Sequence, residues 1–428
     1  MKKVFWIGLV ILGLVLRENG EASTIYVDDD NTSEIEDGTE KYPYRTIQEG
    51  IDACSDFGTV CVRPGIYTGT GNKNLTWKEK HIIVKSQNGP LTTIIDCEKN
   101  GRGFYFNDTG QNSNDIMDGF TIKNGNVAGE WPENYGGGIY CGTFSPSIIN
   151  CIITQNSAST EGAGGGIACL FSSPIIIDCI VIGNKADYFG GGIVCSCSSP
   201  TITNCIIRGN SAVWGGGIHC RFDSSPTITN STIMQNIAGG GGGIYCVRFS
   251  SPTITNCVII QNMANFDGAG VNCYYNSSPT IINCVITGNI ADRYSGGIYC
   301  SNNSSPCITN CIITQNSRYG IYEADTTSDP LTNYNCFYNN TPSDYYDEGL
   351  KSRTVKWLNI KAGFAGNISS DPKFIGNGDY HLQSISPCID KGLNTASGIS
   401  LTDKDGNPRI INGIVDIGVY ECKMEVKP

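Results

Sequence analysis

Charged side chains that could act on a substrate are sparse in the repeated part of the sequence, and Arg221, Asp223 and Arg248 form the best cluster. They lie in equivalent loops of two neighbouring repeats, so a stacked fold would bring them together. A catalytic Arg–Asp cluster is one interpretation. A surface ion pair is the interpretation that we favour, because exposed Arg and Asp side chains commonly pair without a catalytic role.

Histidine offers little support for acid–base catalysis. His81, His219 and His381 are far apart in the sequence, and no local Ser, His and Asp arrangement suggests a catalytic triad. His219 lies between Ile218 and Cys220, and strand alternation predicts that its side chain points outward. We expect all three histidines to be ordinary surface residues.

Two acidic segments could supply oxygen ligands to calcium. One is the run of Asp residues at 28–30, which further acidic residues follow. The other, 403–407, begins like a calcium-binding loop but is followed by Pro408 where such a loop requires Gly. Roles in capping and turns are the alternative. Calcium is the only cofactor that the sequence suggests, and its candidate ligands are Asp28, Asp30, Asp37, Asp403 and Asp405.

Aromatic residues recur at one position just before a glycine-rich turn. They are Tyr135, Phe189, Trp214, Phe266, Tyr294 and Tyr319. Aromatic faces spaced along a rod could stack on sugar rings and so bind an extended glycan. Alternatively, the rings form a hydrophobic ladder that covers the turn. Both interpretations remain open from the sequence.

A repeat of 26–28 residues positions these side chains. Its proline marker occurs seven times, at Pro146, Pro174, Pro200, Pro226, Pro252, Pro279 and Pro306. A period of this length indicates a solenoid. Each copy has three short apolar pieces with two-residue alternation, which is typical of strands. Stacked triplets predict an all-β parallel β-helix with three strands per coil and about 4.8 Å between coils.

Equivalent residues recur at the predicted inward and turn positions. One isoleucine ladder runs from Ile148 to Ile308, and a second, from Ile139 to Ile298, is interrupted only by Val271. Such β-branched side chains fill a narrow core with little loss of rotamer freedom. Asparagine occupies one turn in every copy, from Asn156 to Asn316, where stacked amides can hydrogen bond to each other. A second polar row runs from Asn150 to Asn310.

Most of the 21 cysteines also fall into two rows. The rows run from Cys141 to Cys300 and from Cys151 to Cys311, with Ser231 filling one place in the second. Equivalent positions on adjacent coils have parallel side chains, which opposes the dihedral angle of a disulfide. We therefore favour ladders of buried free thiols, and disulfides between coils are the alternative. The paired spacing of a zinc site is missing.

Both ends of the solenoid are predicted to be closed. Thr46 and Glu49 form a capping box that opens a short helix, suited to covering the first coil. Ile47, Ile51 and Cys54 would share one face of this helix. We divide the chain into a signal peptide (1–22), an N-terminal cap with irregular early coils (23–130), seven regular repeats (131–322), and late coils with a C-terminal cap (323–428).

The first 22 residues have a basic start, an apolar run and a small-residue ending, as in a cleavable signal peptide. Removing them takes three basic and two acidic residues from the 29 and 40 of the chain, which leaves a net charge of −12. This balance argues against nucleic acid as a partner. No later apolar stretch is long enough to span a membrane as a helix. We expect a protein that is secreted or held at the cell surface.

The repeated GGGIYC and SPTITNC segments resemble the right-handed parallel β-helix repeats of the pectate-lyase-like superfamily, and also the repeats of polymorphic outer-membrane proteins. PYRTIQEGIDA (43–53) is similar to the N-terminal module of exported microbial β-helix proteins. SPCIDKG (386–392) and DKDGNPR (403–409) are similar to choice-of-anchor Q domains. The resemblance implies a right-handed β-helix. It defines no activity, because the RxPxxR string of pectate lyases and the polygalacturonase signatures are absent.

Three functions are consistent with these patterns. The first, which we favour, is an exported noncatalytic β-helix that binds polysaccharide or a cell-surface glycan on its lateral surface. The second is a polysaccharide lyase or glycoside hydrolase that acts on acidic polysaccharide, as the resemblance to pectate lyases implies. The third is a structural or adhesin-type surface protein without affinity for glycans.

Overall fold

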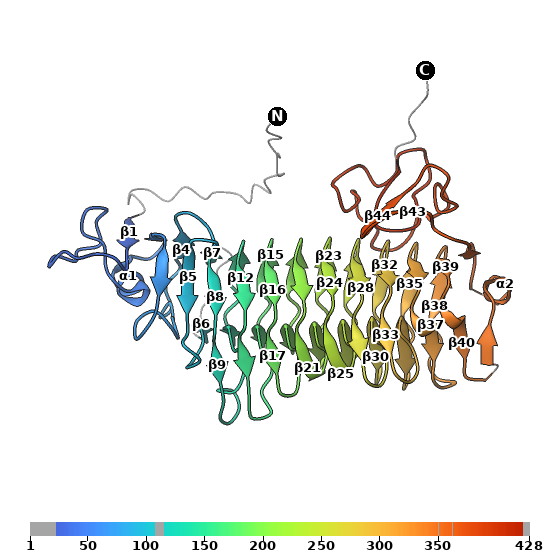
Figure 1. Ribbon diagram of the computed structural model, residues 1–428, viewed down its shortest axis with the longest axis horizontal. Coiled ribbons are helices and arrows are strands. Elements are labelled where there is room, and N and C mark those ends of the chain that lie inside the picture. Colours follow the sequence, from blue (N-terminus) through green and yellow to red (C-terminus); the bar gives the residue numbers. More distant parts are fainter. Residues whose placement is uncertain (1–22, 108–114, 350, 362, 423–428) are drawn as a thin grey trace, which may run out of the picture.

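The computed structural model describes residues 23–107, 115–349, 351–361 and 363–422. They form an elongated rod of stacked coils, with α1 (Ile47–Ala53) near one end and α2 (Val355–Leu358) near the other (Figure 1). The predicted signal peptide, 1–22, lies outside the described residues.

Sheet A runs along the rod and contains twelve parallel strands. In order these are β1 (Thr24–Val27), β2 (Thr59–Val62), β4 (Ile83–Ser86), β7 (Ile116–Asp118), β11 (Ser147–Ile149), β15 (Ile175–Ile177), β19 (Thr201–Thr203), β23 (Thr227–Thr229), β27 (Thr253–Thr255), β31 (Thr280–Ile282), β35 (Cys307–Thr309) and β38 (Leu331–Asn333).

Sheet B also has twelve parallel strands. They are β3 (Gly65–Tyr67), β5 (Thr93–Asp96), β8 (Thr121–Lys123), β12 (Ile152–Thr154), β16 (Ile180–Ile182), β20 (Ile206–Arg208), β24 (Thr232–Met234), β28 (Val258–Ile260), β32 (Val285–Thr287), β36 (Ile312–Thr314), β39 (Cys336–Tyr338) and β42 (Ile368–Ser369).

Sheet C has eleven strands, and the last of them, β41, pairs antiparallel with β40. The strands are β6 (Phe104–Phe106), β10 (Ile139–Cys141), β14 (Ile167–Leu170), β18 (Ile193–Ser196), β22 (Ile218–Arg221), β26 (Ile244–Val247), β30 (Val271–Tyr274), β34 (Ile298–Ser301), β37 (Ser317–Glu323), β40 (Thr341–Asp347) and β41 (Lys351–Arg353).

Sheet D is shorter, with seven parallel strands, and sheet E is a separate hairpin. Sheet D contains β9 (Asn126–Val127), β13 (Ser157–Ala158), β17 (Lys185–Ala186), β21 (Ser211–Trp214), β25 (Ile237–Gly240), β29 (Met263–Ala264) and β33 (Ile290–Ala291), and sheet E pairs β43 (Phe374–Gly376) with β44 (Asp379–Leu382).

One coil shows the path of the chain. β19, β20, β21 and β22 belong to sheets A, B, D and C in turn, and β23 then pairs with β19 one coil further along. Sheets A, B and C confirm the predicted three strands per coil. Sheet D adds a fourth side, which the sequence does not reveal because five of its seven described strands have only two residues, too few to show an alternation.

The predicted isoleucine ladders form the core. Ile202 in sheet A pairs in register with Ile176 and Ile228, and all three side chains are fully buried. Ile193 and Ile218 in sheet C are equally buried and also in register. Stacking identical branched side chains gives each coil the same packing surface as the next, so the core is built by repetition.

The predicted asparagine ladder is present and continuous. The Asn210 amide donates from Nδ2 to Oδ1 of Asn236 at 3.0 Å and to the Val181 carbonyl at 2.9 Å. The backbone N–H of Asn210 donates to the same Oδ1 at 2.9 Å. The row extends beyond Asn316 to Asn340. Each amide therefore satisfies backbone groups that the buried turn would otherwise leave without partners.

Left-handed backbone explains the second polar row and the glycine runs. Asn204 and its equivalents between sheets A and B have φ near +54°, a region that Asn tolerates better than most residues. Gly215 has φ of +67°. A Cβ atom on Gly217 would lie 2.5 Å from the Gly243 carbonyl oxygen of the next coil. The sharp glycine turn predicted from the sequence is confirmed, and close coil stacking requires it.

All 21 cysteines are free thiols, as the favoured interpretation predicts. Most are fully buried, and burial raises the pKa of the Cys141 thiol well above its usual value. Cys197 is the one cysteine with an exposed side chain. We expect a thiol-specific reagent to label Cys197 rapidly in the native protein and all 21 cysteines after denaturation without reductant. Fewer than 21 reactive thiols in the denatured protein would contradict the free-thiol ladders.

The ends of the rod are closed by short helices. The capping box is confirmed: the Thr46 hydroxyl accepts from the Glu49 backbone, and the Glu49 side chain accepts from the Thr46 backbone. Ile47 and Ile51 of α1 are buried against the first coil. At the other end, Val355 and Leu358 of α2 join the same core cluster. Among the described helices, none has the length and apolarity needed to cross a bilayer.

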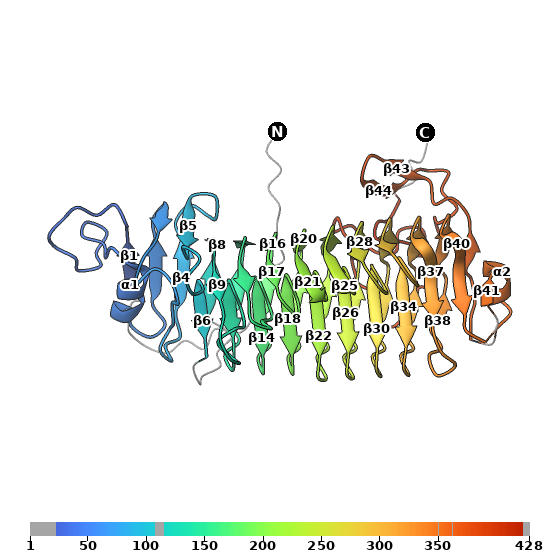
Figure 2. The same ribbon diagram turned by 60° about the horizontal axis from the view of Figure 1, so that its bottom comes forward.

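The segment after β42 folds back along the side of the rod instead of adding coils (Figure 1, red). Its Ile417 and Val419 share a buried cluster with outward-facing Val285 and Ile312 of sheet B. Figure 2 shows this segment away from strands β18, β22 and β26 of sheet C. The C-terminal residues therefore cover a lateral surface, while α2 provides the predicted closure.

Candidate binding face

The outer face of sheet C carries a row of side chains that lie in register from coil to coil. From Tyr140 to Tyr299, each member of the row lies between an inward Ile or Val and an inward Cys, so strand alternation directs it outward. In register order the row is Tyr105, Tyr140, Ala168, Val194, His219, Tyr245, Asn272, Tyr299, Tyr322 and Tyr346. Of these residues, only His219 is a candidate from the sequence. The tyrosines in the repeated GGGIYC segment were the signal for the others.

The predicted aromatic row lies beside this sheet C row and contacts it. Phe189 lies next to His219, with ring centroids 4.8 Å apart, and Trp214 lies 5.4 Å from Tyr245. Tyr294 contacts Tyr299 at 5.7 Å. The two rows, both rich in aromatic residues, therefore contact each other along the rod.

The exposure of the predicted row varies along the rod. Tyr135 is buried, Phe189 and Trp214 are half-buried, and Phe266 and Tyr294 are exposed to 39% and 40%. The burial of Tyr135 agrees with the interpretation in which the aromatic rings cover the glycine-rich turn. Phe266 and Tyr294 are accessible to solvent, as contact with a sugar would require.

Arg221 and Arg248 contact aromatic rings instead of forming the predicted ion pair with Asp223. The Arg221 guanidinium lies 4.5 Å from the Phe189 ring centroid, and its Nη2 donates to the Tyr135 hydroxyl at 2.8 Å. Arg248 lies 4.7 Å from the centroid of Phe222. Within the described residues, neither arginine pairs with Asp223, so the predicted surface ion pair is wrong. Both guanidinium groups instead stack on the neighbouring aromatic rings, as the weakly hydrated guanidinium readily does.

These side chains surround a hollow of about 140 Å³ in the middle of the face. It is lined by Phe189, Trp214, His219, Arg221, Phe222, Tyr245, Val247 and Arg248. None of these described residues carries a carboxylate. The hollow therefore combines two positive charges with aromatic walls, a composition suited to a group that is both anionic and attached to a ring.

His219 is fully buried at this hollow, so its prediction as a surface residue is wrong. Its ring stacks on Tyr245 at 5.2 Å, and both ring nitrogens are buried without a hydrogen-bond partner in the described structure. Burial lowers the pKa of the imidazole well below its usual value, and the charge of Arg221 lowers it further. Strand alternation correctly predicts that the His219 side chain points outward. The ring is nevertheless buried, because the rings of Phe189 and Tyr245 pack against it.

The other two histidines lie away from this face in contact with acids. His81 Nδ1 lies 3.2 Å from Asp115, and His381 contacts Asp379 at 2.5 Å and Asp405 at 2.8 Å. Neither contributes to the hollow around His219.

A second hollow, of about 550 Å³, continues the face toward the N-terminus and shares Phe189 with the first. Trp131, Tyr135 and Tyr188 contribute aromatic surface, while Glu130 and Glu161 contribute carboxylates. Trp131 is 62% exposed. The two hollows share Phe189 and are both lined largely by aromatic residues, and together they are called the aromatic strip below.

The candidate calcium ligands fall into three separate places. Asp28 and Asp30 lie with Asp29, and one oxygen of each carboxylate is within 4.8 Å of the others. Asp28 is also paired with Arg63 at 3.0 Å. Asp37 instead accepts hydrogen bonds from the backbone and hydroxyl of Thr39. The structure thus brings together two of the five predicted ligands.

Asp403 and Asp405, the candidate calcium ligands near the C-terminus, interact with other groups of the protein. Both oxygens of Asp403 accept hydrogen bonds, from backbone groups of Asp405, Asn407 and Glu421. Asp405 contacts His381. This arrangement fits the alternative role in a turn.

Comparison with known proteins finds a matching family model and solved structures of similar fold. The family model described as the right-handed β-helix region matches residues 80–240, 179–291 and 216–415. None of the curated proteins compared by sequence matches the chain. Among solved structures, pectate lyase Pel9A is similar with a TM-score of 0.57, at 14% identity over 94% of this chain and 96% of that one. At this identity the likeness shows the fold alone.

Another similar structure is the A-module of the mannuronan C-5 epimerase AlgE4 of Azotobacter vinelandii. It has 16% identity over 75% of this chain and 95% of that one, with a TM-score of 0.40. Since the family model covers well over half of the residues, and the strands form the expected parallel coils, the chain belongs to the right-handed β-helix family.

Proposed function

We propose that this protein is exported and binds polysaccharide, or a cell-surface glycan, along the outer face of sheet C without cleaving it. The observation that carries the proposal is the aromatic strip around Phe189 and Trp214, with Arg221 and Arg248 at its centre. The signal-peptide pattern at 1–22 supports export.

The composition of the strip supports a sugar polymer as the ligand. Aromatic rings contribute large apolar surfaces with little loss of side-chain freedom, and they suit the apolar faces of sugar rings. Coils repeat about every 4.8 Å, so rings on successive coils offer a series of contacts to an extended chain. Among the residues that the structure describes, none pairs a carboxylate with Arg221 or Arg248, which favours an acidic polymer as the ligand.

A lyase acting on acidic polysaccharide is the second candidate, and His219 is the observation that favours it. A neutral imidazole beside two guanidinium groups has the composition for proton abstraction next to a neutralised carboxylate. Both imidazole nitrogens are, however, buried beneath the surrounding side chains. Binding therefore remains the function that the geometry supports better. A structural or adhesin-type role is the third candidate and requires no glycan affinity.

Affinity electrophoresis of residues 23–428 through gels containing a polyuronate tests the proposal. We expect the wild type to be retarded by the polyuronate. Trp214→Ala and Arg221→Gln should each raise the apparent Kd by roughly tenfold, because Trp and Arg side chains at the centre of a binding surface dominate affinity.

Arg208→Gln is the matched control, because Arg208 is exposed on sheet B and away from the strip. It should be retarded like the wild type. Migration of the wild type that is the same with and without polyuronate, or equal retardation of all variants, would contradict the proposal. Ultraviolet absorbance of unsaturated uronates after incubation would instead support the lyase.

A further inference from the structure

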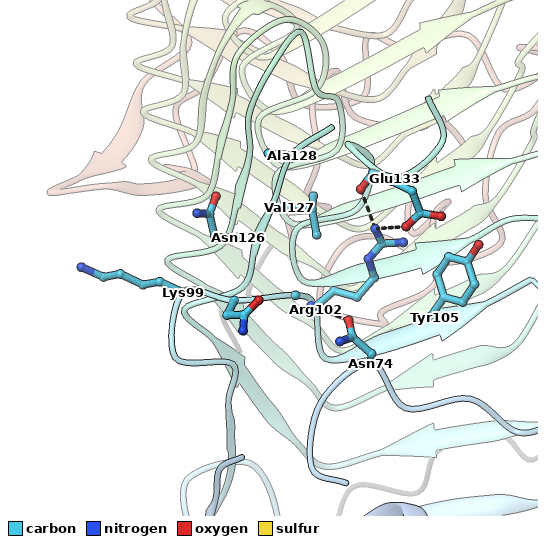
Figure 3. A pocket seen from close by; sticks show the side chains of 10 residues that line it. Asn74, Lys99, Arg102, Tyr105, Asn126, Val127, Ala128 and Glu133 are labelled. Carbon is cyan, nitrogen blue, oxygen red and sulfur yellow. Dashed lines mark hydrogen bonds and ion pairs between the residues drawn. The ribbon is translucent and has the colours of Figure 1, made fainter. Parts of the chain in front are cut away.

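A third hollow, of about 540 Å³, lies where sheet C begins at β6 and sheet D begins at β9. Its size is within the range of small-ligand sites. Asn74, Lys99, Arg102, Tyr105, Asn126 and Glu133 are among the residues that line it (Figure 3). It lies beside the strip described above, since Glu133 here and Asn134 in the second hollow are adjacent in the chain.

The central feature of this hollow is an incompletely paired arginine. Arg102 is 3% exposed, and its Nη2 donates to the Glu133 backbone carbonyl at 2.6 Å. Nη1 is buried without a hydrogen-bond partner within the described structure. A buried charged group that lacks a partner is costly, so such a donor signals a missing acceptor.

The arginine is held in place before any ligand binds. Its guanidinium lies 4.9 Å from the centroid of Tyr105 and 5.3 Å from that of Tyr140, and these two rings stack on each other at 5.0 Å. Its backbone N–H donates to Oδ1 of Asn74 at 3.0 Å. A positioned guanidinium loses little conformational freedom when it binds an anion.

The carboxylate that now faces Arg102 is loosely held. Oε2 of Glu133 lies 3.5 Å from Nη2, longer than a good charge-assisted hydrogen bond, and the Glu133 side chain is 65% exposed. Figure 3 shows the Glu133 side chain beside the guanidinium, while the Lys99 side chain extends away from it. Lys99 and Arg102 therefore line the hollow together with one exposed carboxylate, that of Glu133. An incoming anion could replace this carboxylate beside Arg102.

We propose that this hollow binds the anionic group of an acidic sugar, which displaces the Glu133 carboxylate and accepts a hydrogen bond from Nη1 of Arg102. The ligand class, a sugar, rests on the function proposed above. The anionic group is a carboxylate or a sulfate ester, both of which present planar pairs of oxygens or clustered oxygens to a guanidinium. Lys99, an exposed residue of the lining, adds a second positive charge near the site.

Calorimetry on residues 23–428 with trigalacturonate, a 6-sulfated galactose oligomer and a neutral galactose oligomer tests this site. Arg102→Met should weaken binding of the anionic oligomers by about tenfold or more, because a charge-assisted hydrogen bond is lost. Glu133→Gln should tighten binding, since the competing internal carboxylate is gone. Glu348→Gln is its matched control and should change affinity little, because Glu348 is exposed and lines neither this hollow nor the two hollows of the strip.

The opposite effects of the two variants keep the test independent of folding. Glu133 is exposed, so Glu133→Gln should fold normally, and unchanged or weaker binding by that variant would overturn the proposal. Anionic and neutral oligomers that bind equally would also overturn it. Whichever anionic oligomer binds more tightly identifies the preferred group. If Trp214→Ala abolishes binding while Arg102→Met does not, this site fails and the function proposed above stands.

Discussion

Replacing Asn236 with alanine is expected to lower the free energy of unfolding by about 3 kcal/mol or more, because buried hydrogen-bonding groups lose their partners. Oδ1 of Asn236 accepts from the backbone N–H and the side chain of Asn210, and its Nδ2 donates to the Ile207 carbonyl at 2.9 Å. Asn236 is fully buried. Water cannot take over these bonds without opening the stack of coils.

Denaturant unfolding followed by circular dichroism measures this effect. Asn265→Ala is the matched control, since Asn265 is exposed in a neighbouring turn and only its backbone is bonded to the coil below. It should change stability by no more than about 0.5 kcal/mol. Equal unfolding midpoints for the two variants would contradict the asparagine ladder as a source of stability.

Arg409→Met is expected to destabilise docking of the C-terminal segment by about 3–5 kcal/mol, because it breaks a buried ion pair and leaves one partner uncompensated. Arg409 is 2% exposed and pairs with Glu421 at 3.2 Å. It also donates to Oδ1 of Asn256 in the rod at 2.5 Å, and to the carbonyl of Val419 at 3.1 Å. Burial raises the pKa of the Glu421 carboxyl, and Arg409 is among the groups that oppose this rise.

Limited proteolysis with mass spectrometry distinguishes local detachment from global unfolding. Cleavage within 370–422 should become much faster in Arg409→Met, while the coils stay resistant. Lys391→Met is the control, because Lys391 is an exposed cation of the same segment. Cleavage of Arg409→Met at the rate of the control would show that Arg409 does not hold the segment to the rod.

The regular coils could be predicted from the sequence because each coil repeats the environment of the last. Ile202, Asn210 and Gly215 each have an equivalent residue one repeat earlier and one repeat later. This pattern predicts that Ile202 points inward, that Asn210 lies in a turn, and that Gly215 has left-handed backbone. The same logic identified the thiol ladders. Because stacked coils bring equivalent residues together, the repeat in the sequence predicts which residues of neighbouring coils are in contact.

Features without repetition were not predictable in this way. Arg409 contacts Asn256 across 153 residues, and no periodic pattern links them. Arg102 belongs to the irregular early coils, which have no equivalent copy for comparison, so its incomplete pairing is visible only in the structure. The burial of His219 depends on the particular rings of Phe189 and Tyr245 on either side, whereas alternation predicts direction and not exposure.

The most direct measurement is a crystal structure of residues 23–428 with a bound oligouronate. We expect ordered sugar rings along the outer face of sheet C, in contact with Trp214 or Phe189, with a carboxylate near Arg221 or Arg102. Sugar bound on sheet A or sheet B, or an unoccupied sheet C face at saturating oligouronate, would contradict it.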